Sequence, residues 1–243
     1  MKQPGTVHIG TSGWHYPHWR GPFYPDKLPA SKMLDFYARH FDTIELNNTF
    51  YRLPVPSGVQ NWRDSTPSNF TFAAKGSRFL THMKKLKDTG QGIDRFFERI
   101  NPLGKKLGPI VFQLPPFWEV NPERLDAFLA ALPPRRRYAF ELRNPTWHID
   151  EIYRILRRHN VAFCLFEIAG FHSGFEITAN FTYVRLHGPG AAYQGAYSAS
   201  ALRGWAERIR EWRKTLRAIY IYFDNDQAAY AVENALALKQ MLG

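Results

Sequence analysis

The chain has 243 residues, 44% of them hydrophobic and 16% aromatic, which is enough core for one large α/β domain or two small ones. No apolar run approaches membrane-spanning length and no secretory leader opens the sequence, so we expect a cytoplasmic protein without a membrane partner. A single cysteine excludes an internal disulfide, and a net charge of +11 favours phosphate-rich partners, although a bias towards arginine would give the same balance.

Short apolar runs rich in β-branched and aromatic residues recur along the chain at fairly even spacing. Each has the length of a strand and is apolar on both faces, which is typical of parallel strands covered by helices. Eight such strands are predicted, at residues 7–10, 43–47, 70–75, 109–114, 138–142, 161–166, 182–187 and 218–223.

Helical patterns lie between most of these strands, with apolar residues at the 3.6-residue period. They follow the first, third, fourth and seventh strands, and Ser31 and Asn121 are the predicted N-caps of the first and third helices. Pro122 suits the first helical position. The connection at 168–180, between strands six and seven, is too short and too rich in glycine for a full helix, which predicts a truncated repeat.

This order predicts a single (β/α)8 TIM-like barrel over residues 1–243. A doubly wound open sheet is the alternative. No linker, low-complexity segment or shift in composition divides the chain, so one domain is the simpler organisation.

Polar residues stand at the carboxyl ends of most predicted strands, where a TIM-like barrel carries its chemistry. On three strands they are two residues apart and therefore share a face: Glu45 with Asn47, Glu141 with Arg143, and Arg185 with His187. Two interpretations stay open, a polar ring that lines a binding site or a buried ion-pair network that closes the barrel. The other strand-end residues are Asn48, Lys75, Gln113, Asn144, Glu167, Asp224, Asn225 and Asp226.

The loops add further candidates. The segment TSGWHYPHW after the first strand offers Trp14 and Trp19 for stacking on a flat substrate group, or for packing over the rim. The glycine-rich loop HGPGAAYQG, with Tyr193, follows the seventh strand, a position where barrels often bind phosphate through backbone N–H groups. The basic segment 75–87 is predicted near the mouth, and the run 135–137 on the opposite face.

These residue types suggest acid–base chemistry. His187 is the natural proton carrier near neutral pH, and Glu45 or Glu141 would orient it or act as the opposing base. Cations mixed among the carboxylates, and the absence of HExxH, HxH and CxxC patterns, argue against an obligatory transition metal, so no cofactor is predicted, although a divalent metal is not excluded. The predicted substrate-binding residues are Trp14, Asn47, Lys75, Gln113, Arg143, Arg185, Tyr193 and Asn225.

Seven ordered motifs resemble the uncharacterised YecE-like family, the domain of unknown function 72. They are IGTSGWHYPHWRGPFYP, FDTIELNNTFYRLP, FTFAAKGSRFLTH, GPIVFQLPP, FELRNPTW, YVRLHGP and YFDNDQAAYAVENA. The resemblance implies a barrel of the TIM type, similar to that of endonuclease IV and the sugar isomerases, but no reaction. Family members usually have two asparagines after the last strand, whereas here Asp224 precedes Asn225.

Three functional hypotheses follow. The first is an enzyme that hydrolyses or eliminates a phosphate-bearing or otherwise anionic small molecule at the barrel mouth. The second is a nucleic-acid-binding protein without catalysis, which uses segment 75–87 and the aromatic loop 14–19. The third is a metal-dependent nuclease or sugar isomerase similar to endonuclease IV. The sequence gives no indication of the oligomeric state.

Overall fold

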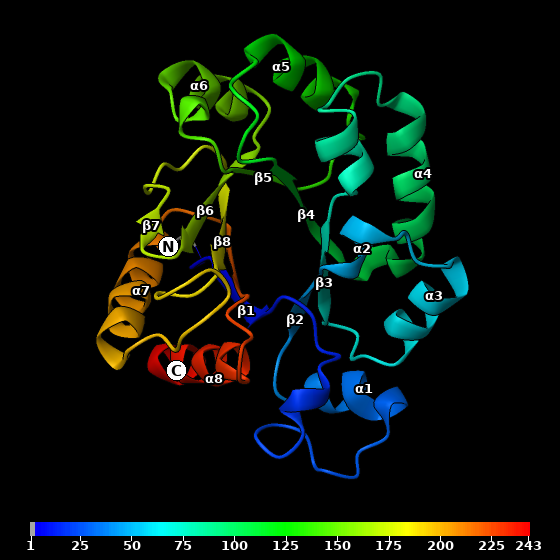
Figure 1. Ribbon diagram of the computed structural model, residues 1–243, viewed down its shortest axis with the longest axis vertical. Coiled ribbons are helices and arrows are strands. Elements are labelled where there is room, and N and C mark those ends of the chain that lie inside the picture. Colours follow the sequence, from blue (N-terminus) through cyan, green and yellow to red (C-terminus); the bar gives the residue numbers. More distant parts are fainter. Residues whose placement is uncertain (1–2) are drawn as a thin grey trace.

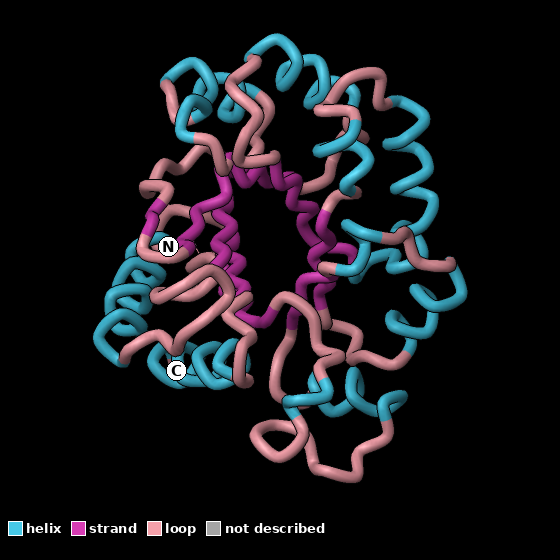
Figure 2. The backbone as a smooth tube through the Cα atoms, viewed as in Figure 1, coloured by secondary structure: helices cyan, strands magenta, loops and turns pink. Residues whose placement is uncertain are grey.

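Eight parallel strands form a ring at the centre of the computed structural model, which describes residues 3–243 (Figures 1 and 2). Neighbouring strands follow the order β1, β9, β8, β6, β5, β4, β3 and β2. The ring closes between β1 and β2 through a bridge from Ser12 to Glu45, where the Gly13 N–H donates to the Glu45 carbonyl at 2.9 Å. The strands are β1 (Thr6–Thr11), β2 (Thr43–Leu46), β3 (Thr71–Lys75), β4 (Leu107–Leu114), β5 (Tyr138–Leu142), β6 (Ala162–Ile168), β8 (Phe181–Leu186) and β9 (Ala218–Phe223), with the short β7 (Phe171–His172) outside the ring.

Helices surround the ring, as the TIM-like prediction requires (Figure 2). Asn121 caps its helix as predicted, because its side chain accepts a hydrogen bond from the Arg124 N–H at 2.9 Å. The N-cap predicted at Ser31 is wrong, since Ser31 lies inside a 3-10 turn that leads into α1. The helices are α1 (Met33–Tyr37), α2 (Asn48–Tyr51), α3 (Pro56–Asp64), α4 (Gly90–Ile100), α5 (Pro122–Ala131), α6 (Asp150–Arg158), α7 (Ala199–Trp212) and α8 (Tyr230–Leu242), with 3-10 helices η1 (Pro17–Trp19), η2 (Ala30–Lys32), η4 (Asn101–Lys106) and η5 (Pro145–Trp147) and the π-helix η3 (Phe79–Met83).

The truncated repeat is confirmed between β6 and β8. No helix lies there in the described part of the chain, and β7 instead folds back antiparallel on the end of β6. Thr178 replaces part of the missing covering structure, because its hydroxyl accepts from the Phe163 N–H and donates to the Val161 carbonyl, both at 2.7 Å.

Two apolar layers hold the barrel together. Residues on the outer strand faces pack against the helices, while the interior is filled by small side chains and by three neighbouring tyrosines, Tyr183, Tyr220 and Tyr222. Cys164 is buried in this interior, and burial raises the pKa of its thiol. The inward positions next along the strands are Glu45, Lys75, Glu141 and Arg185, so the apolar interior supports a layer of charge. No helix in the described residues is both long and apolar enough to span a bilayer.

Candidate active site at the barrel mouth

A guanidinium surrounded by carboxylates forms the floor of the barrel mouth. Arg185 is fully buried on β8 and bonds Glu45 (2.7 Å), Glu141 (2.6 Å) and Asp224 (3.0 Å), which come from β2, β5 and the end of β9. Its Nε also donates to Glu45, at 3.0 Å. All five N–H groups of Arg185 therefore have acceptors, and none is left for an anionic ligand.

The carboxylates of this floor are held by further donors. Glu45 accepts from the hydroxyls of Ser12 and Tyr183, each at 2.6 Å, and Glu141 accepts from Arg143 Nε at 2.5 Å. Burial alone would raise the pKa of Glu141, but the charges of Arg143 and Arg185 hold it well below its ordinary value. The buried ion-pair network considered from the sequence is thus present.

His187 lies within the same network and is fully buried. Its Nε2 is 3.4 Å from Arg143 Nη2 and 3.3 Å from Arg185 Nη1. Nε2 also lies 3.4 Å from Glu141 Oε1, so it accepts from the two guanidinium groups when the ring proton is on Nδ1 and faces a carboxylate when it carries the proton itself. Nδ1 lies 3.0 Å from Asp224 Oδ2, although its N–H is too oblique for a well-formed hydrogen bond. His187 therefore positions Asp224 from below and does not itself reach solvent.

A pocket of about 440 Å³ opens above this floor, within the usual size range of small-molecule sites. We call it the acid–base pocket. Lys75 reaches it from the end of β3, and Asp224 and Asp226 reach it from the end of β9. Its remaining lining residues are Asn47, Tyr51, Ala192, Tyr193, Gln194 and Gln227.

Lys75 is a cation in the lining of this pocket, and no carboxylate in the described part of the chain forms an ion pair with it. Its side chain is 5% exposed and its Nζ lies 4.5 Å above the ring of Phe50, without an ion pair in residues 3–243. Burial, and secondly the charge of Arg185, lower the pKa of Lys75 to about 8. The ammonium form is thus poised to change charge slightly above neutral pH.

The two aspartates of the pocket have pKa values moved in opposite directions. Burial would raise the pKa of Asp224, but its contact with His187 and the charge of Arg185 lower it. Burial instead raises the pKa of Asp226 to about 6, against the hydrogen bond from Trp19 Nε1 and the neighbouring His18. Near neutral pH one carboxyl is therefore ionised while the other carries a proton part of the time, a pattern that separates a base from an acid.

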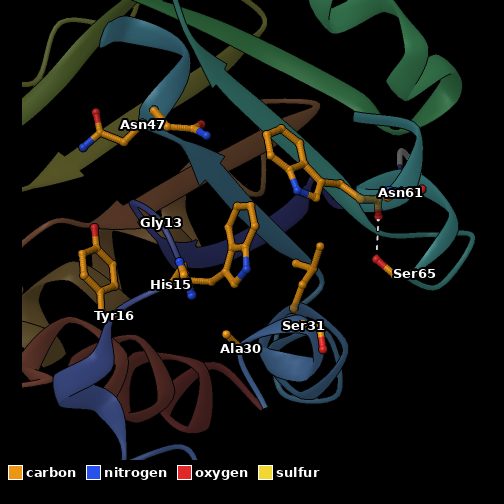
Figure 3. A pocket seen from close by; sticks show the side chains of 12 residues that line it. Gly13, His15, Tyr16, Ala30, Ser31, Asn47, Asn61 and Ser65 are labelled. Atoms are coloured by element: carbon orange, nitrogen blue, oxygen red, sulfur yellow. Dashed lines mark hydrogen bonds between the residues drawn. The ribbon is translucent and has the colours of Figure 1, made fainter. Parts of the chain in front are cut away.

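A second and larger pocket, of about 720 Å³, adjoins the first (Figure 3). We call it the tryptophan pocket, because Trp14 and Trp62 are in its wall with their ring centroids 5.5 Å apart. Asn47 lines both pockets. The remaining lining residues are Gly13, His15, Tyr16, Ala30, Ser31, Leu34, Asn48, Asn61 and Ser65.

The predicted site residues converge at one end of the barrel but differ in access. Lys75, Asn47 and Tyr193 line the acid–base pocket and Trp14 lines the tryptophan pocket. Two others are buried: Gln113 is 6% exposed, and Asn225 bonds Gly195 and Asn234, so that it anchors the loop after β8. Beneath the pockets lie Glu45, Glu141, Arg185 and His187, with Arg143 partly exposed at the edge.

Sequence reasoning assigned no role to Asp224, Asp226 or Trp62. Asp224 and Asp226 follow the last strand and are two residues apart, the same spacing that identified the other polar pairs. The sequence therefore contained a signal for both aspartates. Trp62 had no such signal, because it lies on α3, a helix with one buried residue, Val59. Trp19, by contrast, is buried against Asp226 and cannot stack on a ligand.

The rim beside β2, β3 and β4 combines exposed apolar and basic side chains. Tyr51, Met83 and Phe117 are 75%, 69% and 74% exposed. Lys85 Nζ lies 5.9 Å from the ring of Phe117, and Lys84 is its neighbour. The basic segment 75–87 therefore adjoins the mouth, whereas Arg135 and Arg136 line a separate pocket with Lys105 and His8, from the start of β1. Among residues 3–243, no group of three or more His, Cys, Asp and Glu side chains is arranged to hold a metal ion.

Comparison with known proteins gives one family. The model of a protein of unknown function, DUF72, matches residues 8–243. The UPF0759 protein YecE of Escherichia coli K12 is 33% identical over 142 residues, which cover 57% of this chain and 49% of that protein, so the chain spans about half the length of this curated relative. The UPF0759 protein YunF of Bacillus subtilis is 23% identical over 97% of this chain and 93% of its own. A DUF72 family crystal structure from Thermotoga maritima has a TM-score of 0.88 at 27% identity, covering 98% of this chain and 99% of that one.

Proposed function

The chain belongs to the DUF72 family of proteins of unknown function, and we propose that its barrel mouth is the active site of an enzyme that performs acid–base chemistry on a small anionic substrate. The observation that carries the proposal is the make-up of the acid–base pocket. Lys75, whose ammonium has no carboxylate partner within residues 3–243, lines the same pocket as two aspartates whose pKa values are moved apart.

The charged groups divide the pocket into two sides. Lys75 is the cationic side that suits a phosphate or carboxylate group, and Arg143 stands behind the lining residue Tyr193, to whose hydroxyl it donates at 3.3 Å. Asp224 and Asp226 form the other side. An anion held by Lys75 would thus share the pocket with both aspartates, which would bring a base and an acid to the reacting groups of the substrate.

The proposed roles follow from the protonation states. Ionised Asp224 takes a proton, either from an attacking water or from a substrate carbon, and protonated Asp226 gives a proton to the departing group. His187, Glu45, Glu141 and Arg185 are positioning residues in this scheme, because they are buried beneath the aspartates and hold Asp224 in place. The direct catalytic roles predicted for His187, Glu45 and Glu141 stay predictions.

The test is a screen of phosphate- and carboxylate-bearing small molecules, with products identified by mass spectrometry. For a substrate so found, Asp226→Asn is expected to lower kcat by about 10²–10⁴-fold, the usual contribution of a general acid. Lys75→Met is expected to raise KM. The matched controls are Asp26→Asn and Lys27→Met, both at exposed positions. If D226N and K75M turned over the substrate as D26N and K27M do, the proposed site would be wrong.

A second candidate function is nucleic-acid binding without catalysis, and the rim of exposed Tyr51, Met83 and Phe117 beside Lys84 and Lys85 favours it. Aromatic side chains interleaved with lysines suit single-stranded nucleic acid, where bases stack and phosphates pair.

Fluorescence anisotropy with a labelled single-stranded oligonucleotide, titrated at several salt concentrations, tests this candidate. Replacing Lys84, Lys85 and Lys87 with Gln should reduce the slope of log affinity against log salt by about 2. The control has the same change of charge in the separate basic pocket, at Lys105, Arg135 and Arg136. If both triple variants reduced the salt slope equally, the oligonucleotide would be attracted non-specifically to a basic protein, and the rim would be excluded as its binding site.

A further inference from the structure

The tryptophan pocket has walls of a different kind from those of the acid–base pocket. None of the twelve residues that line it is Asp, Glu, Lys or Arg. An ionised ligand group would lose its hydration there without gaining a charged partner, so the pocket suits an uncharged group. The anionic group of a ligand would therefore bind in the acid–base pocket, and an uncharged group of the same ligand would bind in the tryptophan pocket.

Two indoles provide surfaces for a flat ring. Trp14 comes from the loop after β1 and Trp62 from α3, and both are partly buried, with ring planes at 85° to each other. Leu34 of α1 adds an apolar wall. Perpendicular indoles offer a planar ligand one ring to stack on and a second to meet edge to face, the two preferred geometries of aromatic pairs.

Side-chain amides supply the polar contacts. Asn47, Asn48 and Asn61 line the pocket, and Figure 3 places Asn47 and Asn61 on different sides of it. Asn47 lines both pockets, and its buried Oδ1 has no hydrogen-bond partner among residues 3–243, so a small rotation of this amide would offer an acceptor to a ligand N–H or O–H. An amide both donates and accepts, and this matches the edge of a ring that carries adjacent N–H and C=O or nitrogen groups.

We propose that the tryptophan pocket binds an uncharged heteroaromatic ring, and that the substrate of the acid–base pocket is an anion joined to such a ring, as in a nucleoside monophosphate. The ring-binding part stands on the tryptophan pocket alone, and the anionic part rests on the proposed function. In this arrangement Trp14 and Trp62 contact the faces of the ring, and the asparagines hydrogen-bond its polar edge. Lys75 binds the anion in the adjoining pocket, which shares Asn47 with the first.

Isothermal titration calorimetry with adenosine, uridine, their 5′-monophosphates, ribose 5-phosphate and glucose tests the inference on the full-length protein. The monophosphates should bind at least 10-fold more tightly than either the nucleosides or ribose 5-phosphate. Trp14→Leu and Trp62→Leu should each weaken nucleoside binding by about 10–100-fold, the usual effect of removing a stacking residue. Trp212→Leu on α7 is the control, and urea denaturation of each variant verifies folding.

The outcomes separate the two proposals. Nucleoside binding that W14L and W62L abolish but K75M leaves intact would support the ring site independently of catalysis. Nucleosides that bind no better to the wild type than to W14L and W62L, or no better than glucose, would overturn it. In that case, ribose 5-phosphate binding that K75M weakens would still support the anion site of the proposed function.

Discussion

Replacing Arg185 with Met should be among the most destabilising single changes in this protein. The guanidinium lies 2.6–3.0 Å from three carboxylates, and two of them, Glu45 and Glu141, have no solvent exposure. Met keeps the stem volume but removes the guanidinium from all three carboxylates, so that Glu45 keeps its two hydroxyl donors and Glu141 keeps Arg143. Removing one partner of a buried pair costs about 3–5 kcal/mol, and a domain has about 5–15 kcal/mol of stability in total.

A surface pair provides the comparison. Arg39 bonds Asp35 at 2.9 Å, nearly the same distance, but its side chain is 68% exposed. Arg39→Met should therefore cost less than about 1 kcal/mol. Urea denaturation at pH 7, followed by both circular dichroism and fluorescence, measures the two free energies of unfolding and tests whether the transitions coincide.

The loss of unfolding free energy in R185M, relative to the wild type, should also become smaller at acid pH. In the wild type the pKa of Glu141 is held well below its ordinary value, so the stability that this provides is present above the unfolded-state pKa and is lost as pH falls through the folded-state pKa. Without the Arg185 guanidinium, Glu141 loses one of the two positive charges that oppose the effect of burial, so its pKa rises relative to the wild type and the variant relieves buried charge more readily by taking up a proton. A deficit that grew between pH 7 and pH 5 would contradict this reasoning.

If R185M does not fold, Glu141→Gln tests the same ion-pair network, because it keeps the Arg185 guanidinium and its two other carboxylates. We expect a smaller loss of about 1–3 kcal/mol, since the amide retains hydrogen bonds but not charge. The reasoning would be refuted if R185M and R39M lost the same stability at pH 7 with unchanged denaturant slopes.

Three other predictions concern the site and the core. Affinity for inorganic phosphate, measured by calorimetry, should fall as pH rises through about 8, where Lys75 loses its proton, and K75M should remove that dependence. Turnover of an identified substrate should decline as pH rises through about 6, because Asp226 acts in its protonated form, and D226N should lack this limb of the pH profile. Gly76→Ala should destabilise the protein by about 1–3 kcal/mol, because the added Cβ would lie 2.2 Å from Phe112 Cδ1. Gly204→Ala, on an open face of α7, should instead stabilise it by about 0.5–1 kcal/mol. Urea denaturation measures both changes.

The sequence predicted the barrel well because strand and helix signals depend on local periodicity. All eight strands formed within two residues of their predicted bounds, and the same-face spacing of Glu45, Glu141 and Arg185 correctly placed them inward at one end. Periodicity does not report depth, however. Whether Lys75 reaches solvent depends on a loop far away in the chain, the one carrying Tyr193, and the same loop folds back over His187 from only six residues further on.

The helix α3 was missed for a related physical reason. It buries one residue, Val59, so its sequence has no apolar stripe to reveal it, and with it the contribution of Trp62 went unnoticed. The assignment of Arg185 as an anion ligand stays a prediction, but its contacts oppose it. Its type suited the role, but only coordinates could reveal that three carboxylates already use its donors.

The closure between β1 and β2 links folding order to site formation. Every other neighbouring pair of barrel strands has a ladder of paired residues, whereas this junction depends on a bridge between Ser12 and Glu45, and the first strand pairs with the last. Glu45 is also a partner of Arg185. A nascent polypeptide that still lacks β9 cannot close the ring, and therefore cannot complete the charged floor. Deuterium uptake at this junction should report how often the closed ring opens locally.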